Sequence, residues 1–229
     1  QSYVVNSIIE DYDSQKRETY LLKGVTGSGK TEVYLEIIEH VLSMDKQVIM
    51  LIPEIALTYQ TVMRFYRRFG GVVSILNSRM SKGERYDQYL RAKRGEIKIM
   101  IGPRSALFTP FDKLGLIVID EEHEGAYKSD SVPKYHARET AIELAAMCNA
   151  SVLLGSATPS VDAYYKAQRG EYKLFVLNNR AGESILPEIE TVDLREELKC
   201  GNKSIFSRRL KKLMDERLAN KEQIMLFLN

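Results

Sequence analysis

Two short motifs contain the side chains of this sequence that could do chemistry. The first has the letters GVTGSGKT at residues 24–31. The second has the letters DEEH at residues 120–123, directly after the apolar run at 116–119. The first motif is typical of a loop that binds phosphate groups, and the second offers carboxylates that can hold a metal ion and activate water. Together they predict hydrolysis of a nucleoside triphosphate.

The first motif has the local context that a phosphate-binding loop requires. Apolar residues at 20–22 predict a short buried strand before it, and the apolar spacing over 31–43 predicts a helix after it. Gly24, Gly27 and Gly29 permit backbone angles that other residues avoid, so successive N–H groups can point at phosphate oxygens at the positive end of the helix. A flexible glycine- and serine-rich loop before a helix is the alternative.

The side chains that end this loop complete the expected triphosphate site. Lys30 would neutralise the β and γ phosphates, and the Thr31 hydroxyl would bind Mg²⁺. The expected nucleotide-binding residues of the loop are therefore Gly24, Val25, Thr26, Gly27, Ser28, Gly29, Lys30 and Thr31.

The second motif has a solvated loop as its alternative interpretation, because acidic residues after a strand are common. Beside a phosphate-binding loop, however, the carboxyl end of a neighbouring parallel strand is where a ligand crevice opens. We therefore expect Asp120 to hold the hydration shell of Mg²⁺, and Glu121 to orient and deprotonate the attacking water. Glu122 is the alternative base, but adjacent side chains on an extended chain point to opposite sides, which favours Glu121. The predicted catalytic residues are Lys30, Asp120 and Glu121.

The composition limits the classes of protein to which the chain can belong. Its 229 residues, 44% of them hydrophobic, can bury one substantial core and part of another unit. No apolar stretch is long enough to span a bilayer. The net charge of +2 gives no bulk basicity, so any contact with DNA must come from local placement of charge.

The cysteines and the first residues of the sequence indicate the expected cellular location. Cys148 and Cys200 lie far apart and lack the spacing of a zinc site, so a reducing cytoplasm is the expected location. There is no Met at position 1 and no leader pattern. The sequence is therefore expected to be an internal piece of a longer chain, without a visible targeting signal.

Apolar runs typical of strands alternate with helical patterns along most of the chain. This repetition predicts an α/β domain with a mostly parallel central sheet and helices on both faces. Strands are expected at 47–52, 72–76, 97–101, 116–120, 151–154 and 173–177, and helices at 56–69, 81–94, 136–147 and 160–168.

The last part of the chain has a different pattern. Residues 178–187 are polar and loop-like, and the elements expected after them are an isolated strand at 188–193, a basic amphipathic helix at 207–220 and a strand at 223–228. A final strand without a partner is expected of a truncated second domain. The predicted boundaries are 1–180 for the first domain and 181–229 for the remainder.

Further motifs occur in the order expected of a known family. They are LIPEIALT at 51–58, GPRSALF at 102–108, DEEH at 120–123 and GSATP at 155–159. With them the chain resembles superfamily 2 helicases of the DEAH type. More narrowly, it resembles the first motor domain of the PriA family, the replication-restart helicases also called primosomal protein N′. This closer similarity covers nearly the whole chain and is carried by residues 24–34, 53–58, 105–110, 118–123, 135–138 and 180–182.

The resemblance implies an ATP-dependent DNA translocase of 3′ to 5′ polarity in the bacterial cytoplasm. ATP and Mg²⁺ would bind in the cleft between two RecA-like lobes. The chain would supply the first lobe, a RecA-like P-loop NTPase domain, and the start of the second. The family's arginine finger and zinc-binding cysteines would lie outside it. The isolated chain is therefore expected to have no zinc site, to bind nucleotide weakly and to unwind little or nothing.

The resemblance also implies partners. They are single-stranded and forked DNA, together with primosome and single-strand-binding proteins in the full-length protein. No membrane contact is expected, and a monomer is expected.

Several single residues gain roles from the resemblance. Gln1 matches a glutamine that reads adenine, although a frayed terminus is the alternative. Thr58, Arg104 and Ser105 match residues that contact the single-strand backbone, since hydroxyls and arginine bind phosphates without reading sequence. The alternatives are a helix cap and a surface charge.

A second set of residues would couple ATP to DNA. Ser156 and Thr158 match the motif that links the two lobes, and a plain strand-to-helix turn is the alternative. His123 could couple ATP to the Ser156 motif, or be a satisfied polar residue.

The loop at 124–138 matches an aromatic-rich loop that couples DNA binding to ATP hydrolysis in the family. Val132 and Pro133 stand where a tryptophan is often found, so base stacking would depend on Tyr127 and Tyr135. Tyrosines that pack on the domain are the alternative.

Two basic stretches, 64–68 and 208–212, lie beside apolar residues at helical spacing. A solvated helix face is the default interpretation of both. Neither is expected to contribute to the site.

Other function classes fit the motifs less well. A signalling GTPase would share the phosphate loop, and residues 112–115 give a DxxG, but the Asn-Lys-x-Asp motif that reads guanine is missing from the sequence. A small-molecule kinase would need a lid and an acceptor pocket instead of a Ser-Ala-Thr motif. A catalytically silent binding module would tolerate loss of Lys30 or Glu121, which are both present. The remaining alternatives are another superfamily 2 nucleic-acid translocase and a P-loop fragment that only binds nucleotide.

Overall fold

A parallel sheet organises the first part of the chain. The computed structural model describes residues 1–180 and 188–227. These residues form two compact units, one before and one after the segment at 181–187.

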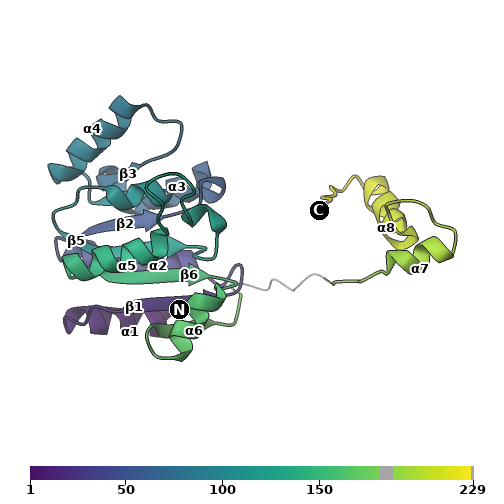
Figure 1. Cartoon of the computed structure of the whole chain (residues 1–229), viewed down its shortest axis with the longest axis horizontal. Coiled ribbons are helices and arrows are strands. Elements are labelled where there is room, and N and C mark those ends of the chain that lie inside the picture. The colour runs from purple at the N-terminus through teal and green to yellow at the C-terminus, as the bar shows by residue number, and fades with distance from the viewer. Residues whose placement is uncertain (181–187, 228–229) are drawn as a thin grey trace. The chain divides into compact units, whose positions relative to one another are not determined.

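The described part of the first unit contains a seven-stranded sheet in which every strand pair is parallel (Figure 1). The strand order is β3-β4-β2-β5-β6-β1-β7. The strands are β1 (Thr19–Gly24), β2 (Gln47–Leu51), β3 (Val73–Ile75), β4 (Ile99–Gly102), β5 (Leu114–Asp120), β6 (Ser151–Ser156) and β7 (Lys173–Leu177).

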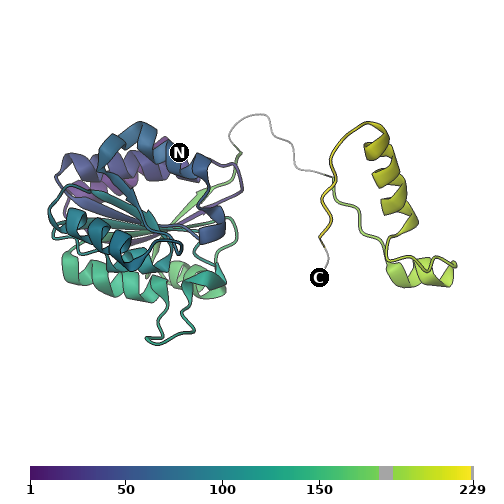
Figure 2. The same ribbon diagram turned by 90° about the horizontal axis from the view of Figure 1, so that it is seen from above.

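Helices cover both faces of this sheet (Figure 2). One face is covered by α1 (Ser2–Asp13), α2 (Lys30–Ser43) and α3 (Tyr59–Phe69). The other is covered by α4 (Lys82–Lys93), α5 (Ala137–Cys148) and α6 (Val161–Gln168). Short 3₁₀ turns lie in the connections: η1 (Glu54–Ala56), η2 (Gly70–Val72), η3 (Arg104–Phe108) and η4 (Gly125–Tyr127).

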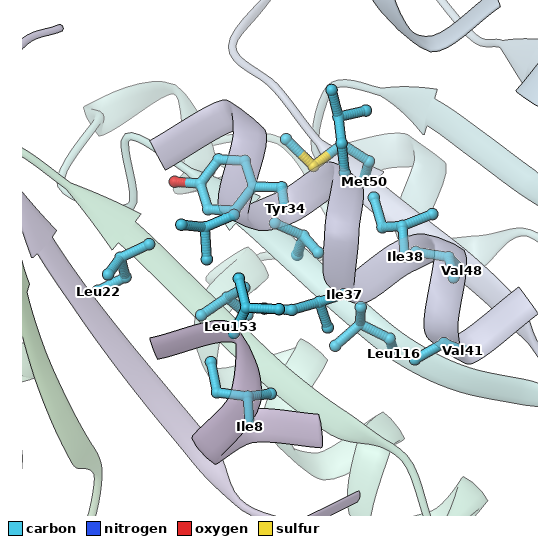
Figure 3. Packing of buried hydrophobic residues seen from close by; sticks show 14 of the residues in the cluster. Ile8, Leu22, Tyr34, Ile37, Ile38, Val41, Val48, Met50, Leu116 and Leu153 are labelled. Atoms are coloured by element: carbon cyan, nitrogen blue, oxygen red, sulfur yellow. The ribbon is translucent and has the colours of Figure 1, made fainter. Parts of the chain in front are cut away.

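The sheet buries a separate hydrophobic core on each face. Under α1 to α3, Ile37 and Ile38 of α2 belong to one buried cluster with Leu116 of β5 and Leu153 of β6 (Figure 3). On the other face, the small side chains of α5 let its backbone approach the strands; they are Ala137, Ala141 and Ala145. Burying one large aliphatic side chain contributes about 1.5–3 kcal/mol. The central strands are apolar almost throughout because both of their faces are covered.

Most of the predicted strands and helices are confirmed, with bounds that shift by a few residues. The largest shift is in the helix expected from residue 56, which begins at Tyr59. Thr58 caps that helix, because its side chain accepts a hydrogen bond from the Thr61 amide at 3.3 Å. Helix α1 was not predicted, although its apolar face is buried; the residues of that face are Val4, Val5, Ile8 and Tyr12.

The expectation that β5 neighbours β1 is wrong, because β6 lies between them. In the register, Asp120 of β5 is paired with Gly155 of β6, and Lys23 of β1 is paired with Ser156. All carboxyl ends of a parallel sheet point to the same edge. The two motifs therefore still meet at that edge, with the end of β6 between them.

The second unit contains two helices in its described part, α7 (Leu194–Lys199) and α8 (Arg208–Ala219). The helix expected at 207–220 is confirmed by α8. The strands expected at 188–193 and 223–228 are wrong for the described residues, since no strand forms at 188–193 or 223–227. A strand needs a partner to satisfy its backbone groups, and the described part of this unit supplies none.

Some expectations fall on residues outside the description. They include the domain boundary at 180/181, the motif at 180–182 beyond its first residue, and the last residue of the strand expected at 223–228. The assignment of 181–229 to a second motor lobe stays a prediction. Within the two described stretches, no helix combines the length and hydropathy needed to cross a bilayer.

Asp45, in the connection between α2 and β2, holds the starts of two further strands. Its carboxylate accepts a hydrogen bond from Lys98 Nζ at 2.9 Å and pairs with Lys113 Nζ. Lys98 lies just before β4, and Lys113 just before β5. These two ammonium groups lower the pKa of Asp45 to about 2.

We expect the Asp45→Asn variant to lose a pH-dependent part of its stability. Because the pKa of Asp45 is lowered on folding, its contribution is fully present above its unfolded pKa, near 4, and is lost as the pH falls through about 2. Urea unfolding from pH 2 to 6 should give a difference in free energy between chain and variant that disappears toward pH 2. Asp87→Asn, at an exposed carboxylate without an ion pair among the described residues, is the control. A difference that is constant over this range would contradict the prediction.

Candidate functional site

The loop between β1 and α2 has a backbone that requires glycine. Gly27 and Gly29 have φ angles of 79° and 85°, which L side chains rarely adopt. A Cβ on Gly24 would come within 2.5 Å of Ser28 Oγ. Ser28 Oγ is buried and has no hydrogen-bond partner among the described residues. The loop therefore leaves a polar atom that an oxygen-rich ligand would satisfy, as expected of a phosphate site.

Lys30, at the start of α2, brings a nearly buried cation to this loop. Its Nζ donates a hydrogen bond to the Gly24 carbonyl at 2.9 Å and lies 3.7 Å from Glu121 Oε1. The two predicted motifs are thus in contact, although β6 separates their strands.

Asp120, the last residue of β5, is held by two tyrosine hydroxyls. Tyr34 of α2 donates to Asp120 Oδ1 at 2.9 Å, and Tyr127 of η4 donates to the Asp120 carbonyl at 2.7 Å. Burial raises the pKa of the Asp120 carboxyl, against the lowering effect of the Tyr34 hydrogen bond. Burial, and then the adjacent Asp120, raises the pKa of Tyr34 well above its usual value. Burial also raises the pKa of Tyr127, so both tyrosines stay neutral hydrogen-bond donors.

The position of Tyr34 depends on the glycine of the GSATP motif. A Cβ on Gly155 would come within 1.7 Å of the Tyr34 hydroxyl. No side chain fits there without displacing the ring, so β6 needs glycine at this point. The motif of β6 thereby shapes the surroundings of Asp120.

The chain turns sharply after Asp120, and the turn separates two adjacent glutamates. Glu121 has φ of 48°, in the left-handed region, so the extended backbone assumed for these residues ends at Asp120. Glu121 remains partly exposed, near Lys30. Glu122 is 1% exposed, and both of its oxygens are engaged. Its Oε2 accepts from Arg138 Nη1 at 2.9 Å, and its Oε1 accepts from the Ser160 amide at 2.6 Å.

His123 connects the acidic motif to the end of β6. Its Nδ1 lies 2.8 Å from Ser156 Oγ and 3.7 Å from Glu121 Oε2. Ser156 is buried, and its Oγ also accepts from the Thr158 amide at 3.0 Å. The Thr158 side chain is exposed. A chain of contacts therefore runs from Glu121 through His123 to the GSATP motif.

A pocket of about 420 Å³ contains residues of both predicted motifs; its lining residues are Thr26, Gly27, Ser28, Gly29, Lys30, Thr31, Glu32, Arg64, Asp120 and Glu121. A pocket of equal volume beside α6 is lined by no residue of either motif, so the lining residues, and not the volume, single out the site. Gln1 lies at the loop as well, because its Nε2 donates to the Ser28 carbonyl at 2.8 Å. The first residue is thus packed on the loop and not frayed.

Of the residues expected to contact DNA, Arg104 and Ser105 belong to η3, and Thr58 lies between η1 and α3. Thr58 acts as the cap of α3, which was the alternative for this residue. Arg104 Nη1 donates to the carbonyls of Ala126 and Lys128 at 2.8 and 2.6 Å. Arg104 and Ser105 line a second pocket, of about 490 Å³, together with Tyr127. The arginine therefore connects this surface to the loop that follows the acidic motif.

The expectation that Tyr127 stacks on bases is not met in this structure. The residue is 1% exposed, and its hydroxyl is bonded to the Asp120 carbonyl, so no ring face is open. Tyr135 is half-buried and meets Phe108 edge to face, with ring centroids 5.2 Å apart. Phe108 is 52% exposed and was not predicted as a site residue.

Besides Phe108, sequence reasoning missed four residues that contact or line the site: Tyr34, Arg64, Arg138 and Ser160. Tyr34 lies four residues after Lys30 and so shares its helix face, but it was assigned only to the apolar pattern. Arg64 was assigned to a solvated face. Arg138 was counted only among the residues that carry the family resemblance, and Ser160 only as the start of a helix. Local sequence does not indicate that both would bind the buried Glu122.

A protein-family model matches the part of the chain that contains both motifs. Residues 1–161 match the family model described as type III restriction enzyme, res subunit. The chain belongs to this family. The matched residues of the chain include both motifs, all strands from β1 to β6 and the start of α6.

Curated proteins named replication restart protein PriA match the chain over nearly its whole length. The chain is 49% identical over 222 residues to the replication restart protein PriA of Bacillus subtilis (strain 168), a match that covers 97% of the chain and 28% of that protein. It is 46% identical over 231 residues to PriA of Chlamydia muridarum, covering 100% of the chain and 31% of that protein. The predicted resemblance to PriA is confirmed, and the chain spans less than a third of the length of these relatives.

Solved structures show the fold. The chain matches the DUF1998 helicase MrfA with a TM-score of 0.60 at 19% identity, covering 98% of this chain and 35% of that chain. It matches the helicase domain of Pyrococcus furiosus Hef with a TM-score of 0.54 at 19% identity, covering 77% and 37%. The chain thus has the predicted RecA-like α/β fold, with a parallel sheet and helices on both faces.

We expect Arg138→Ala to destabilise the chain by about 3–5 kcal/mol, because the substitution leaves the buried Glu122 carboxylate without its cation. Urea unfolding followed by circular dichroism measures the loss. Arg169→Ala, which removes an exposed arginine at the end of α6, should change stability by less than about 1 kcal/mol. Similar losses in the two variants would contradict a structural role for the Glu122–Arg138 pair.

Proposed function

We propose that this chain is the nucleotide-binding first motor lobe of an ATP-dependent DNA helicase or translocase that acts in replication restart. The observation that carries the proposal is the pocket in which Lys30 meets Asp120 and Glu121. The similarity to PriA supports the replication-restart context. Because the chain spans less than a third of those relatives, the activity belongs to a longer protein.

The phosphate loop and its surroundings fit a magnesium-bound triphosphate. Gly27 and Gly29 shape the loop, and the orphaned Ser28 hydroxyl can donate to a phosphate oxygen. The Thr31 hydroxyl and the Asp120 carboxylate supply the hard oxygen ligands that Mg²⁺ prefers. When bound, Mg²⁺ neutralises charge on the β and γ phosphates. Lys30 would exchange its bond to the Gly24 carbonyl for phosphate oxygens.

Glu121 is the proposed base for the attacking water. Its carboxylate is partly exposed beside Lys30, whereas the Glu122 oxygens are occupied by Arg138 and Ser160. Release of Lys30 to the phosphates would leave Glu121 free to accept a proton from water. His123 lies between Glu121 and Ser156, so it can transmit the state of the base to β6 and onward to Thr158.

The proposed DNA partners are single strands and forks. Arg104 and Ser105 would contact the DNA backbone, as would Thr58 in addition to capping α3. Tyr135 with Phe108 offers aromatic edges for unpaired bases. Primosome and single-strand-binding proteins are proposed partners of the longer protein, whose polarity would be 3′ to 5′. The proposed cofactors are ATP and Mg²⁺, in a monomer of the bacterial cytoplasm.

We expect Lys30→Ala to abolish nucleotide binding by the chain, because the only cation of the phosphate-loop motif is lost. Titration with a fluorescent ATP analogue in the presence of MgCl₂ measures the affinity. Lys16→Ala, at an exposed lysine outside the pocket, should bind like the unsubstituted chain. Equal affinity of all three proteins would refute the proposed site.

The Glu121→Gln variant should keep nucleotide affinity while losing turnover by about a hundredfold or more, since the amide cannot accept the proton of water. Turnover is measured as phosphate release, with and without single-stranded DNA, in a protein that carries both motor lobes. Undiminished hydrolysis would move the base to another residue.

A further inference from the structure

Arg64 is the one basic residue in the lining of the nucleotide pocket that lies outside both motifs. It is located on α3, and the next residue, Phe65, is fully buried in the core. Four residues further on, Arg68 Nη2 donates to Glu36 and Glu39 of α2 at 2.8 and 2.5 Å. These contacts fix the face of α3 that is turned toward α2.

Residues four apart lie on the same face of a helix, so Arg64 shares the face of Arg68 one turn nearer the carboxyl edge of the sheet. At that edge α2 begins, with the phosphate loop before it. Arg68 forms ion pairs with two carboxylates. Arg64, in contrast, is exposed and forms no hydrogen bond or ion pair with the described residues.

The pocket lining carries more acidic than basic side chains. Its acidic side chains are Glu32, Asp120 and Glu121, against the basic Lys30 and Arg64. Lys30 is already bonded to the Gly24 carbonyl and lies beside Glu121. A triphosphate adds several negative charges to this lining. Arg64 is therefore the basic group of the described lining that is available to the ligand without breaking an existing contact.

We propose that Arg64 binds the terminal phosphate of the nucleotide and makes the pocket selective for triphosphates over diphosphates. This inference depends on the proposed function, since it names the recognition of the substrate at the same site. Arg64 lines the same pocket as Asp120 and Glu121, the carboxylates that would act at the terminal phosphate. A guanidinium matches the geometry of phosphate oxygens with two parallel hydrogen bonds.

The test compares Arg64→Gln with Arg67→Gln in the 229-residue chain. Arg67 is exposed on the same helix and does not line the pocket. Affinities are measured by titration with a fluorescent, non-hydrolysable ATP analogue and with the matching ADP analogue, both with MgCl₂. Arg64→Gln should weaken triphosphate binding about tenfold or more and change diphosphate binding by less than about twofold. Arg67→Gln should change neither.

A second variant separates charge from geometry. Arg64→Lys keeps the positive charge but loses the two-pronged contact, so its triphosphate affinity should fall between those of the unsubstituted chain and Arg64→Gln. Equal weakening of triphosphate and diphosphate binding in Arg64→Gln would overturn the inference, as would unchanged affinity for both.

The failure of this inference can be told apart from the failure of the proposed function. If the unsubstituted chain binds neither nucleotide, both are overturned. If it binds both nucleotides, loses both in Lys30→Ala and is indifferent to Arg64→Gln, the proposed site stands and only the role of Arg64 is overturned.

Discussion

The buried carboxylate of Glu122 is the constraint on which the arrangement of the site depends. An unpaired charge in this position would cost several kcal/mol, so the fold must bring it partners. Arg138 comes from the start of α5, and Ser160 supplies both its amide and its hydroxyl from the cap of α6. The end of β5 is thereby joined to two helices on one face of the sheet. With Glu122 held inside, the turn at Glu121 leaves that neighbour near Lys30.

Strand β6 connects the two motifs instead of keeping them apart. Gly155 leaves the space that the Tyr34 hydroxyl needs to reach Asp120, and Ser156 contacts His123. A change in the position of β6 would therefore alter the surroundings of Asp120, through Tyr34, and of Glu121, through His123. This arrangement gives a physical reason for the position of the GSATP motif beside the pocket that we propose to bind nucleotide.

The loop after the acidic motif connects the pocket to the surface around η3. Arg104 holds the backbone of this loop at Ala126 and Lys128, and Tyr127 between them supports the Asp120 carbonyl. A residue expected to meet DNA and a residue expected to hold Mg²⁺ are thus separated by one short segment. Burial of Tyr127 serves this connection, while Phe108 and Tyr135 keep aromatic edges near the surface.

The sequence by itself determined the glycine-rich loop at 24–31, the alternation of strands and helices, and most helix starts, because glycine conformation, apolar periodicity and capping act over a few residues. It also indicated that Lys30 and the acidic motif would meet at one edge of the sheet. Only the tertiary structure decided that β6 separates β1 from β5, that Glu122 and Tyr127 are buried, and that Arg64 lines the pocket. Those outcomes depend on contacts between segments far apart in the chain. Local sequence patterns do not indicate which of these segments will pack together.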